Sequence, residues 1–89
     1  MIESVDKLVS LIRTVVSELV TNPIDVAITH ELRTTTSIEL AVLTVTISVA
    51  DADVGRIIGR QGRTINAIRT LAGAIAGLHG FEVDIDVLE

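Results

Sequence analysis

The chain has 89 residues, 48% of them hydrophobic and only one, Phe81, aromatic, so it predicts a small globular domain with an aliphatic core and excludes disorder. It has no cysteine, which excludes disulfides and thiol chemistry, and no uninterrupted apolar run of about 18 residues that could span a membrane. Residues 54–80 have a charge of +4 and the remainder −9, so the net charge of −5 excludes a uniformly basic nucleic-acid binder but predicts one basic patch.

The first predicted element is a helix over about residues 2–21, the start of a single domain that covers residues 1–89. Apolar residues recur at three- and four-residue steps from Val5 to Leu19, with polar residues between them, which is typical of a one-sided helix. Pro23 ends this helix because the residue before a proline is kept out of helical dihedrals. The opening residues lack the basic segment and cleavage site of a secretion signal, so we expect a cytoplasmic protein.

Two strands are predicted after this helix. The stretch "IDVAITH", residues 24–30, alternates apolar and polar positions and predicts the first strand. The polar run "ELRTTTS", residues 31–37, predicts a hairpin connection to a longer strand over residues 38–49.

The longer strand has apolar residues on both of its faces. One face holds Leu43, Val45, Ile47 and Val49. The opposite face holds Ile38, Leu40 and Val42 at the beginning of the strand. This change of parity indicates either a bulge or a second covered face near Ala41.

The region after this strand predicts two helices separated by a short turn, and then a last strand. Asp51 or Asp53 would cap the first helix or lie in its first turn, where an acid favours the helix dipole. The letters "GRQG" interrupt that helix, and a second helix continues to about Leu78. The final "FEVDIDVLE" alternates apolar and acidic residues and predicts a strand with one buried face. The residues expected on the inner face of the second helix are Ile65, Ile68, Leu71, Ala72 and Ile75.

The predicted order is helix, strand, strand, helix, helix, strand, which belongs to the α+β class. The first two strands would pair as an antiparallel hairpin, and a connection through two helices normally returns the next strand parallel. We therefore expect a three-stranded mixed sheet covered on one face by three helices.

The segment "VGRIIGRQGRTI" gathers glycines, arginines and aliphatic residues around the predicted turn. Gly59 and Gly62 bracket the turn, and because neither has a Cβ, a sugar-phosphate chain could approach the backbone amides directly. The second helix starts here, so its unpaired amides would also face a bound anion. Arg60 and Arg63 would supply positive charge, and Arg56 would flank the path.

Residues 57–65, "IIGRQGRTI", match the K-homology (KH) signature of two aliphatic residues, Gly-x-x-Gly, two free positions and an aliphatic residue. With its order of elements, the whole chain resembles a type II KH domain and is similar to the small bacterial KhpA (YlqC) family. That resemblance implies an RNA chaperone or post-transcriptional regulator that clamps about four nucleotides of a single strand. The residues implied to contact RNA are Gly59, Arg60, Gln61, Gly62, Arg63 and Arg56, with an aliphatic floor of Ile58 or Ile57, Ile65 and strand residues such as Val45.

The rival function is a protein-interaction or dimerisation module with a KH fold and little affinity for RNA. The acidic body and the glycine spacing of the second helix favour it. Gln61 is neutral where many family members have a second basic residue in the loop, and with the acidic body it predicts a modest, salt-sensitive affinity for RNA. The resemblance implies pairing with a second copy or with a second KH-containing protein of the Jag/EloR type. Gly73 and Gly77 are expected either to let their helix lie close to the sheet or the first helix, or to mark such an interface. Arg69 is expected on the outer face of the same helix, away from RNA.

The sequence predicts no metal, no cofactor and no catalysis. His30 and His79 lie far apart in the sequence, and Asp84 and Asp86 read as a solvated acidic strip rather than an acid/base pair. The glycine spacing fits neither the dinucleotide-binding fingerprint nor the P-loop. We therefore expect a non-enzymatic binder of single-stranded RNA. Single-stranded DNA is the alternative ligand, because a contact to the 2′-hydroxyl leaves no signature in the sequence.

Overall fold

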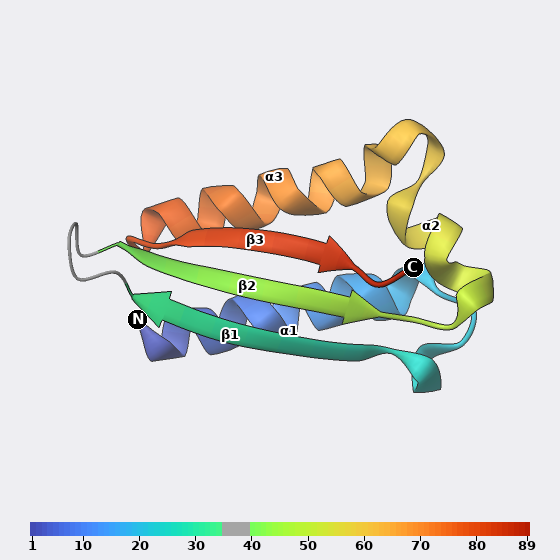
Figure 1. The fold of residues 1–89 in the computed structure, drawn as a ribbon, viewed down its shortest axis with the longest axis horizontal. Coiled ribbons are helices and arrows are strands. Elements are labelled where there is room, and N and C mark those ends of the chain that lie inside the picture. Colours follow the sequence, from blue (N-terminus) through green and yellow to red (C-terminus); the bar gives the residue numbers. More distant parts are fainter. Residues whose placement is uncertain (35–39) are drawn as a thin grey trace.

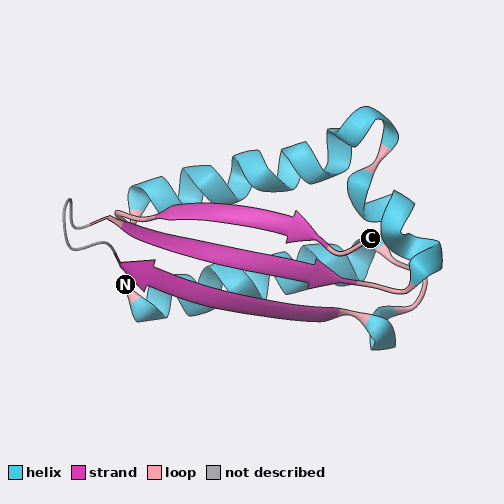
Figure 2. Ribbon diagram, viewed as in Figure 1, coloured by secondary structure: helices cyan, strands magenta, loops and turns pink. Residues whose placement is uncertain are grey.

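The computed structural model describes residues 1–34 and 40–89, which form three strands and three α-helices joined by short 3-10 turns (Figure 1). The two long helices lie against one face of the sheet, and the shortest helix closes one end of it (Figure 2). The predicted α+β fold with a mixed sheet and three helices is confirmed. In chain order the elements are α1 (Ile2–Leu19), η1 (Pro23–Asp25), β1 (Ala27–Thr34), β2 (Ala41–Ser48), η2 (Asp51–Asp53), α2 (Val54–Ile58), η3 (Arg60–Gly62), α3 (Arg63–Leu78) and β3 (Glu82–Val87).

β2 is the central strand of the sheet, whose order is β1-β2-β3. β1 pairs with β2 in the antiparallel direction along its whole length. β3 pairs with β2 in the parallel direction, so that Ile85 lies opposite Val45. The chain runs from β2 to β3 through α2 and α3, which is the long crossover that parallel pairing requires. Within the described ranges, no helix has the length and apolar character needed to cross a bilayer.

The first strand begins later than predicted. The prediction started it at residue 24, but Pro23–Asp25 forms a 3-10 turn in which the side chain of Ile24 is 93% exposed. Pro23 explains the difference, because its ring fixes φ near the helical value and its nitrogen cannot donate to a sheet ladder. The strand therefore starts only at Ala27.

The first strand also ends later than predicted. The run over residues 31–37 was expected to be a connection, but its first four residues extend β1. Leu32 explains the extension, because it lies opposite Leu43 and packs against the core. The prediction is therefore wrong for residues 31–34, and residues 35–37 lie outside the described part of the chain.

The second strand has no bulge between Ala41 and Ser48. Its pairing with β1 advances one residue at a time from Ala41, which lies on the covered face with Leu43. Val42 lies on the opposite face and is half-buried. Ile38, on which the predicted change of parity partly rested, lies outside the described residues.

The core is aliphatic and lies between the helices and the sheet. Leu71 was expected on the inner face of α3, but it is 51% exposed, and Ala76 is buried instead. The buried positions of α3 follow steps of three, four and four residues, and Leu71 is about 100° around the helix from its neighbour Ala72. The buried residues of the long elements are Val5, Leu8, Val9, Ile12 and Val16 of α1, Ala41, Leu43, Val45 and Ile47 of β2, and Ile65, Ile68, Ala72 and Ala76 of α3.

Gly73 and Gly77 do not serve close packing inside the chain. A Cβ added at either position would meet nothing within 4 Å among the described residues. The prediction that they let α3 approach the sheet or α1 is therefore wrong. Their alternative role, at an interface with another molecule, stays a prediction.

Candidate nucleic-acid interface

The Gly-x-x-Gly loop, residues 59–62, is a tight turn between α2 and α3 built from left-handed backbone conformations. Gly59 has φ 76° and ψ 170°, Gln61 has φ 58° and ψ 25°, and Gly62 has φ 75° and ψ 14°. An L-residue rarely adopts such angles, and only glycine takes the Gly59 conformation routinely. The turn therefore depends on the glycines at its two ends.

The two glycines are required for different reasons. A Cβ on Gly59 would lie 2.8 Å from the backbone nitrogen of Thr64, so this position has no space for a side chain. A Cβ on Gly62 would meet Asn66 Nδ2 at 3.6 Å, which is an ordinary contact. Gly59 thus lets the loop fold back against the start of α3, whereas Gly62 is required for its φ alone.

Both glycine amides already have partners inside the turn. The Gly59 N–H donates to the Gly55 carbonyl at 2.9 Å, and the Gly62 N–H donates to the Gly59 carbonyl at 3.1 Å. The amide of Arg63, the first residue of α3, donates to the Arg60 carbonyl. An anion at this turn would therefore meet the other amides of the loop and the arginine side chains, not the glycine amides that the sequence pattern had indicated.

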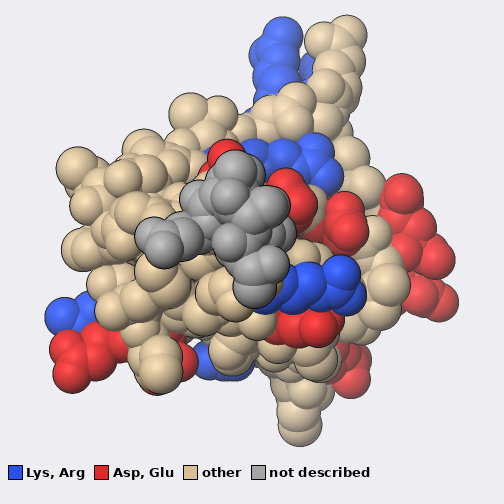
Figure 3. All heavy atoms as spheres, turned by 60° about the vertical axis from the view of Figure 1, so that its left-hand side comes forward, with Lys and Arg blue, Asp and Glu red and all other residues tan. Residues whose placement is uncertain are grey.

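The three arginines around the loop are not equivalent. Arg60 and Arg63 are exposed, and within the described part of the chain neither forms an ion pair. Arg56 on α2 lies with its Nε 3.5 Å from a carboxylate oxygen of Asp53. Basic atoms project without acidic neighbours at the top of the view in Figure 3, whereas acidic atoms gather lower down on the right. Two arginines of the loop region are thus free to bind an anion, and the charge of the third is partly neutralised.

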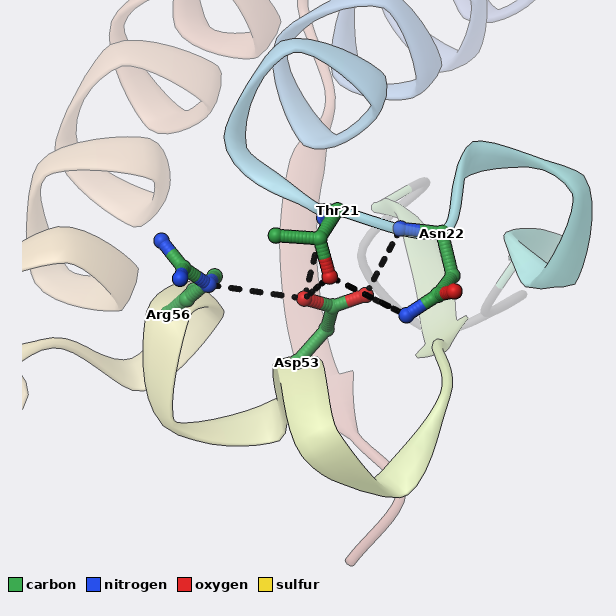
Figure 4. A network of polar contacts seen from close by, with 4 residues as sticks. All are labelled: Thr21, Asn22, Asp53 and Arg56. Atoms are coloured by element: carbon green, nitrogen blue, oxygen red, sulfur yellow. Dashed lines mark hydrogen bonds and ion pairs between the residues drawn. The ribbon is translucent and has the colours of Figure 1, made fainter.

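Asp53 occupies the N-cap position of α2 and is fully buried, yet its side chain makes no capping hydrogen bond to that helix. Its carboxylate accepts hydrogen bonds from the segment that follows α1: from the backbone N–H and hydroxyl of Thr21 at 3.0 and 2.9 Å, and from the backbone and side-chain N–H groups of Asn22 at 3.0 and 3.1 Å (Figure 4). The sequence predicted a cap or first-turn acid here. The structure instead shows a buried acceptor that joins the end of α1 to the start of α2.

These donors favour the charged form of Asp53. The backbone N–H of Thr21 is the largest cause, and its hydroxyl and Asn22 add to it, so the pKa of Asp53 falls from its ordinary 3.8 to about 2 although burial acts in the opposite direction. The carboxylate therefore stays ionised at neutral pH and holds both the α1 connection and the guanidinium of Arg56.

The predicted aliphatic floor is mostly inside the core. Ile57 and Val45 are fully buried, and Ile65 is 5% exposed, so these side chains support the loop from below. Ile58, the last residue of α2, is half-buried and is the member of the predicted floor that reaches the surface beside Gly59.

Arg69 and Asn66 were not assigned to the site by the sequence. Arg69 was expected on the outer face of α3, but its guanidinium reaches β3, where Nε and Nη2 donate to the Ile85 carbonyl at 3.2 and 3.0 Å. Its Nη1 donates to Asn66 Oδ1 at 3.3 Å. The three-residue spacing of Asn66 and Arg69 on one helix was visible in the sequence, but the contact with Ile85 depends on the packing of α3 beside β3.

Two relatives from different bacteria are both named RNA-binding protein KhpA. The chain is 42% identical over 79 residues to the RNA-binding protein KhpA of Listeria monocytogenes, a match that covers 89% of this chain and 96% of the relative. It is 46% identical over 43 residues to the RNA-binding protein KhpA of Chlamydia pneumoniae, which covers 48% of this chain and 55% of the relative.

Solved structures share the fold. A single-residue variant of Aquifex aeolicus Era, bound to GDP and aluminium fluoride, superposes with a TM-score of 0.63 at 19% identity, over 91% of this chain and 30% of the Era chain. A structure of Era in complex with MgGDPNP and nucleotides 1506–1542 of 16S ribosomal RNA superposes with a TM-score of 0.64 over the same shares. This chain thus spans about a third of the length of Era, and the likeness concerns the fold alone.

The family model described as "KhpA/KhpB, KH domain" matches residues 9–87, from the middle of α1 to the last residue of β3. The family is not enzymatic, which confirms the prediction that the chain is not an enzyme. From the extent of this match and the identity with the Listeria protein, the chain belongs to the KhpA/KhpB family of KH-domain proteins.

Proposed function

We propose that the chain binds single-stranded RNA at the Gly-x-x-Gly loop, with Arg60 and Arg63 as its main charged contacts. The observation that carries this proposal is two exposed arginines on a left-handed turn at the start of α3, neither of which forms an ion pair with any residue that the structure describes. The relatives are named RNA-binding proteins, which supports RNA as the ligand.

The charge distribution limits the strength of this binding. Each phosphate contact on a single strand contributes about −0.7 to the slope of log affinity against log salt concentration. Arg60 and Arg63 as full contacts give a slope of about −1.4, and four contacts would give about −2.8. Because Arg56 is paired with Asp53, we expect a salt slope of about −1.4, the value for two phosphate contacts.

Fluorescence anisotropy with short single-stranded RNAs tests the proposal. The loop variant is Arg60→Asp with Gln61→Asp, and circular dichroism first establishes that it folds. The matched control is Arg13→Glu with Thr14→Glu, which makes the same change in net charge at two exposed positions of α1. We expect the loop variant to lose the salt-sensitive binding and the control to keep most of it.

Equal losses in both variants would contradict the proposal, because binding would then follow net charge rather than the loop. Equal binding by the loop variant and the wild type would contradict it as well. Parallel titrations with DNA of the same sequence separate a general single-strand binder from one that requires the 2′-hydroxyl.

A second candidate function is pairing with another protein through α3. Leu71 is 51% and Leu78 84% exposed on this helix, and a Cβ added at Gly73 or Gly77 would meet nothing within 4 Å in the described part of the chain. A second copy, or a KH-containing protein of the Jag/EloR type, would cover these aliphatic side chains. Light scattering of the wild type and of Leu78→Lys tests this function, which requires an assembly that the variant weakens.

The proposal for the wider role is supported by the resemblance to the family and not by the geometry of the loop. We infer that residues 1–89 act as one KH domain in the cytoplasm, as an RNA chaperone or post-transcriptional regulator. This role rests on RNA binding by the loop, so the anisotropy experiment comes first.

A further inference from the structure

Arg69 occupies the middle of the free edge of β3. Leu88, which follows β3, donates its N–H to the Ile47 carbonyl of β2 at 2.9 Å. Every second residue of a strand points its backbone N–H and C=O to the same side, so those of Glu82, Asp84 and Asp86 also face β2. Val83, Ile85 and Val87 therefore present their backbone groups to the opposite side, at the free edge of the sheet. Arg69 reaches this edge from α3 and donates twice to the Ile85 carbonyl.

The guanidinium keeps two donors for a ligand. An arginine has five N–H donors. Nε and one N–H of Nη2 bond Ile85, and one N–H of Nη1 bonds Asn66. Among the described residues Arg69 has no other hydrogen-bond partner, and the residue is exposed, so one N–H on each terminal nitrogen is available. Two neighbouring N–H groups held in a fixed plane form the fork that binds paired acceptors.

Asn66 connects this fork to the loop. Its Nδ2 lies beside Gly62, 3.6 Å from where a Cβ would be, and its Oδ1 accepts from Arg69 at 3.3 Å. Asn66 and Arg69 thus lie one after the other along the first two turns of α3, between the end of the loop and the edge of β3. The nucleotides next to those held at the loop would pass Asn66 and Arg69.

The surroundings of Arg69 favour a base over a phosphate. A surface hollow of about 330 Å³ is lined by Arg69, Val83, Asp84, Ile85 and Asp86. This volume lies at the small end of the range of about 300–1,000 Å³ that is typical of small-ligand sites. Asp84 and Asp86, which are among the lining residues, carry carboxylates that would repel a phosphate but can accept hydrogen bonds from a neutral base. Guanine can bind the arginine and a carboxylate at once. Its O6 and N7 accept hydrogen bonds from an arginine fork, and its ring and amino N–H groups can donate to a carboxylate.

We propose that Arg69, held by Ile85 and Asn66, is a specificity-determining residue that selects guanine in the bound strand. The proposal rests on RNA binding by the loop and adds a base preference to it. A bidentate contact between arginine and guanine discriminates by about fivefold to 150-fold against the other bases.

Anisotropy titrations of oligouridine that contains one guanosine, one adenosine or one 7-deazaguanosine test this preference. The wild type should bind the guanosine RNA at least about fivefold more tightly than the adenosine RNA. Replacement of N7 by carbon should remove most of this ratio without any change to the protein. Arg69→Lys, which keeps the charge but loses the fork, should bring the ratio close to unity whatever its overall affinity. Arg33→Lys, on the opposite edge strand, should retain the ratio of the wild type.

Several outcomes would overturn the proposal. A wild type that binds both RNAs equally, or a guanosine preference that survives in Arg69→Lys or with 7-deazaguanosine, would show that the fork does not read the base. The loop variant Arg60→Asp with Gln61→Asp, titrated in parallel, separates the two hypotheses. If it loses binding while the base preference is absent, the clamp stands and the guanine subsite fails. If the wild type binds no RNA, both fail.

Discussion

Replacing Gly59 by alanine should destabilise the whole domain, because this glycine is required by both conformation and space. Its φ of 76° and ψ of 170° lie in a region that only glycine adopts readily, and forcing another residue there costs about 1–3 kcal/mol. The new Cβ would also lie 2.8 Å from the Thr64 nitrogen, and overpacking of this kind costs about 1–3 kcal/mol more. The sum, about 2–6 kcal/mol, is a large part of the roughly 4–13 kcal/mol expected for a domain of this size.

Thermal unfolding followed by circular dichroism measures this effect. For a domain of this size each kcal/mol shifts Tm by about 4–8 °C, so a loss of about 3 kcal/mol lowers Tm by about 12–24 °C. The matched control is Gly55→Ala in α2, where the added Cβ meets nothing within 4 Å. Alanine is favoured over glycine within a helix by about 0.5–1 kcal/mol, so this control should raise Tm by a few degrees. A Gly59→Ala protein that melts within about 4 °C of the wild type would refute the reasoning.

Three further predictions concern the same region. Gly62→Asn should be nearly neutral in Tm and Gly62→Ala should cost about 1 kcal/mol, because asparagine tolerates the left-handed conformation and the added Cβ has room. The pKa of Asp53 is lowered from 3.8 to about 2, so its carboxylate stabilises the fold above pH 4 and this contribution is lost as the pH falls toward 2. The difference in the free energy of unfolding between the wild type and Asp53→Asn, measured with urea, should therefore become smaller over that pH interval. Arg60→Gln should reduce the salt slope of RNA binding by about 0.7, and Arg56→Gln by less, because Arg56 is paired with Asp53.

The sequence predicted those features that depend on near neighbours along the chain. Alternation in β2 and β3, the three- and four-residue steps of α1, and the glycine spacing of the loop are all local patterns, and each corresponds to an observed element. Leu71 shows the limit of such patterns. Its spacing fits the inner face of α3, but the packing of that helix decides which positions are covered, and Leu71 is exposed.

The contacts that organise the site depend on distant residues and were not predictable from spacing. Asp53 accepts from Thr21 and Asn22, which precede it by 32 and 31 residues, and Arg69 donates to Ile85, 16 residues further on. Asp53 carried a weak local signal, because an acid before a helix is expected to cap it. The true partners only come into reach when α1 and α2 meet.

An acidic chain can still bind an anion at one place when its acids and bases occupy different surfaces. Glu82, Asp84 and Asp86 bond to β2 through their backbones and point their side chains to the face of the sheet opposite α1 and α3, whereas Arg60 and Arg63 project from the loop at the end of the helical layer. Charges separated by more than a Debye length, about 8 Å at physiological ionic strength, interact weakly. The acidic face therefore lowers the affinity of the loop less than acids beside the loop would, while it disfavours RNA elsewhere on the molecule. Arg69 lies where these two surfaces meet, so under the proposal above a nucleotide that reaches it leaves the phosphate-binding region and places its base between the arginine fork and the carboxylates of β3.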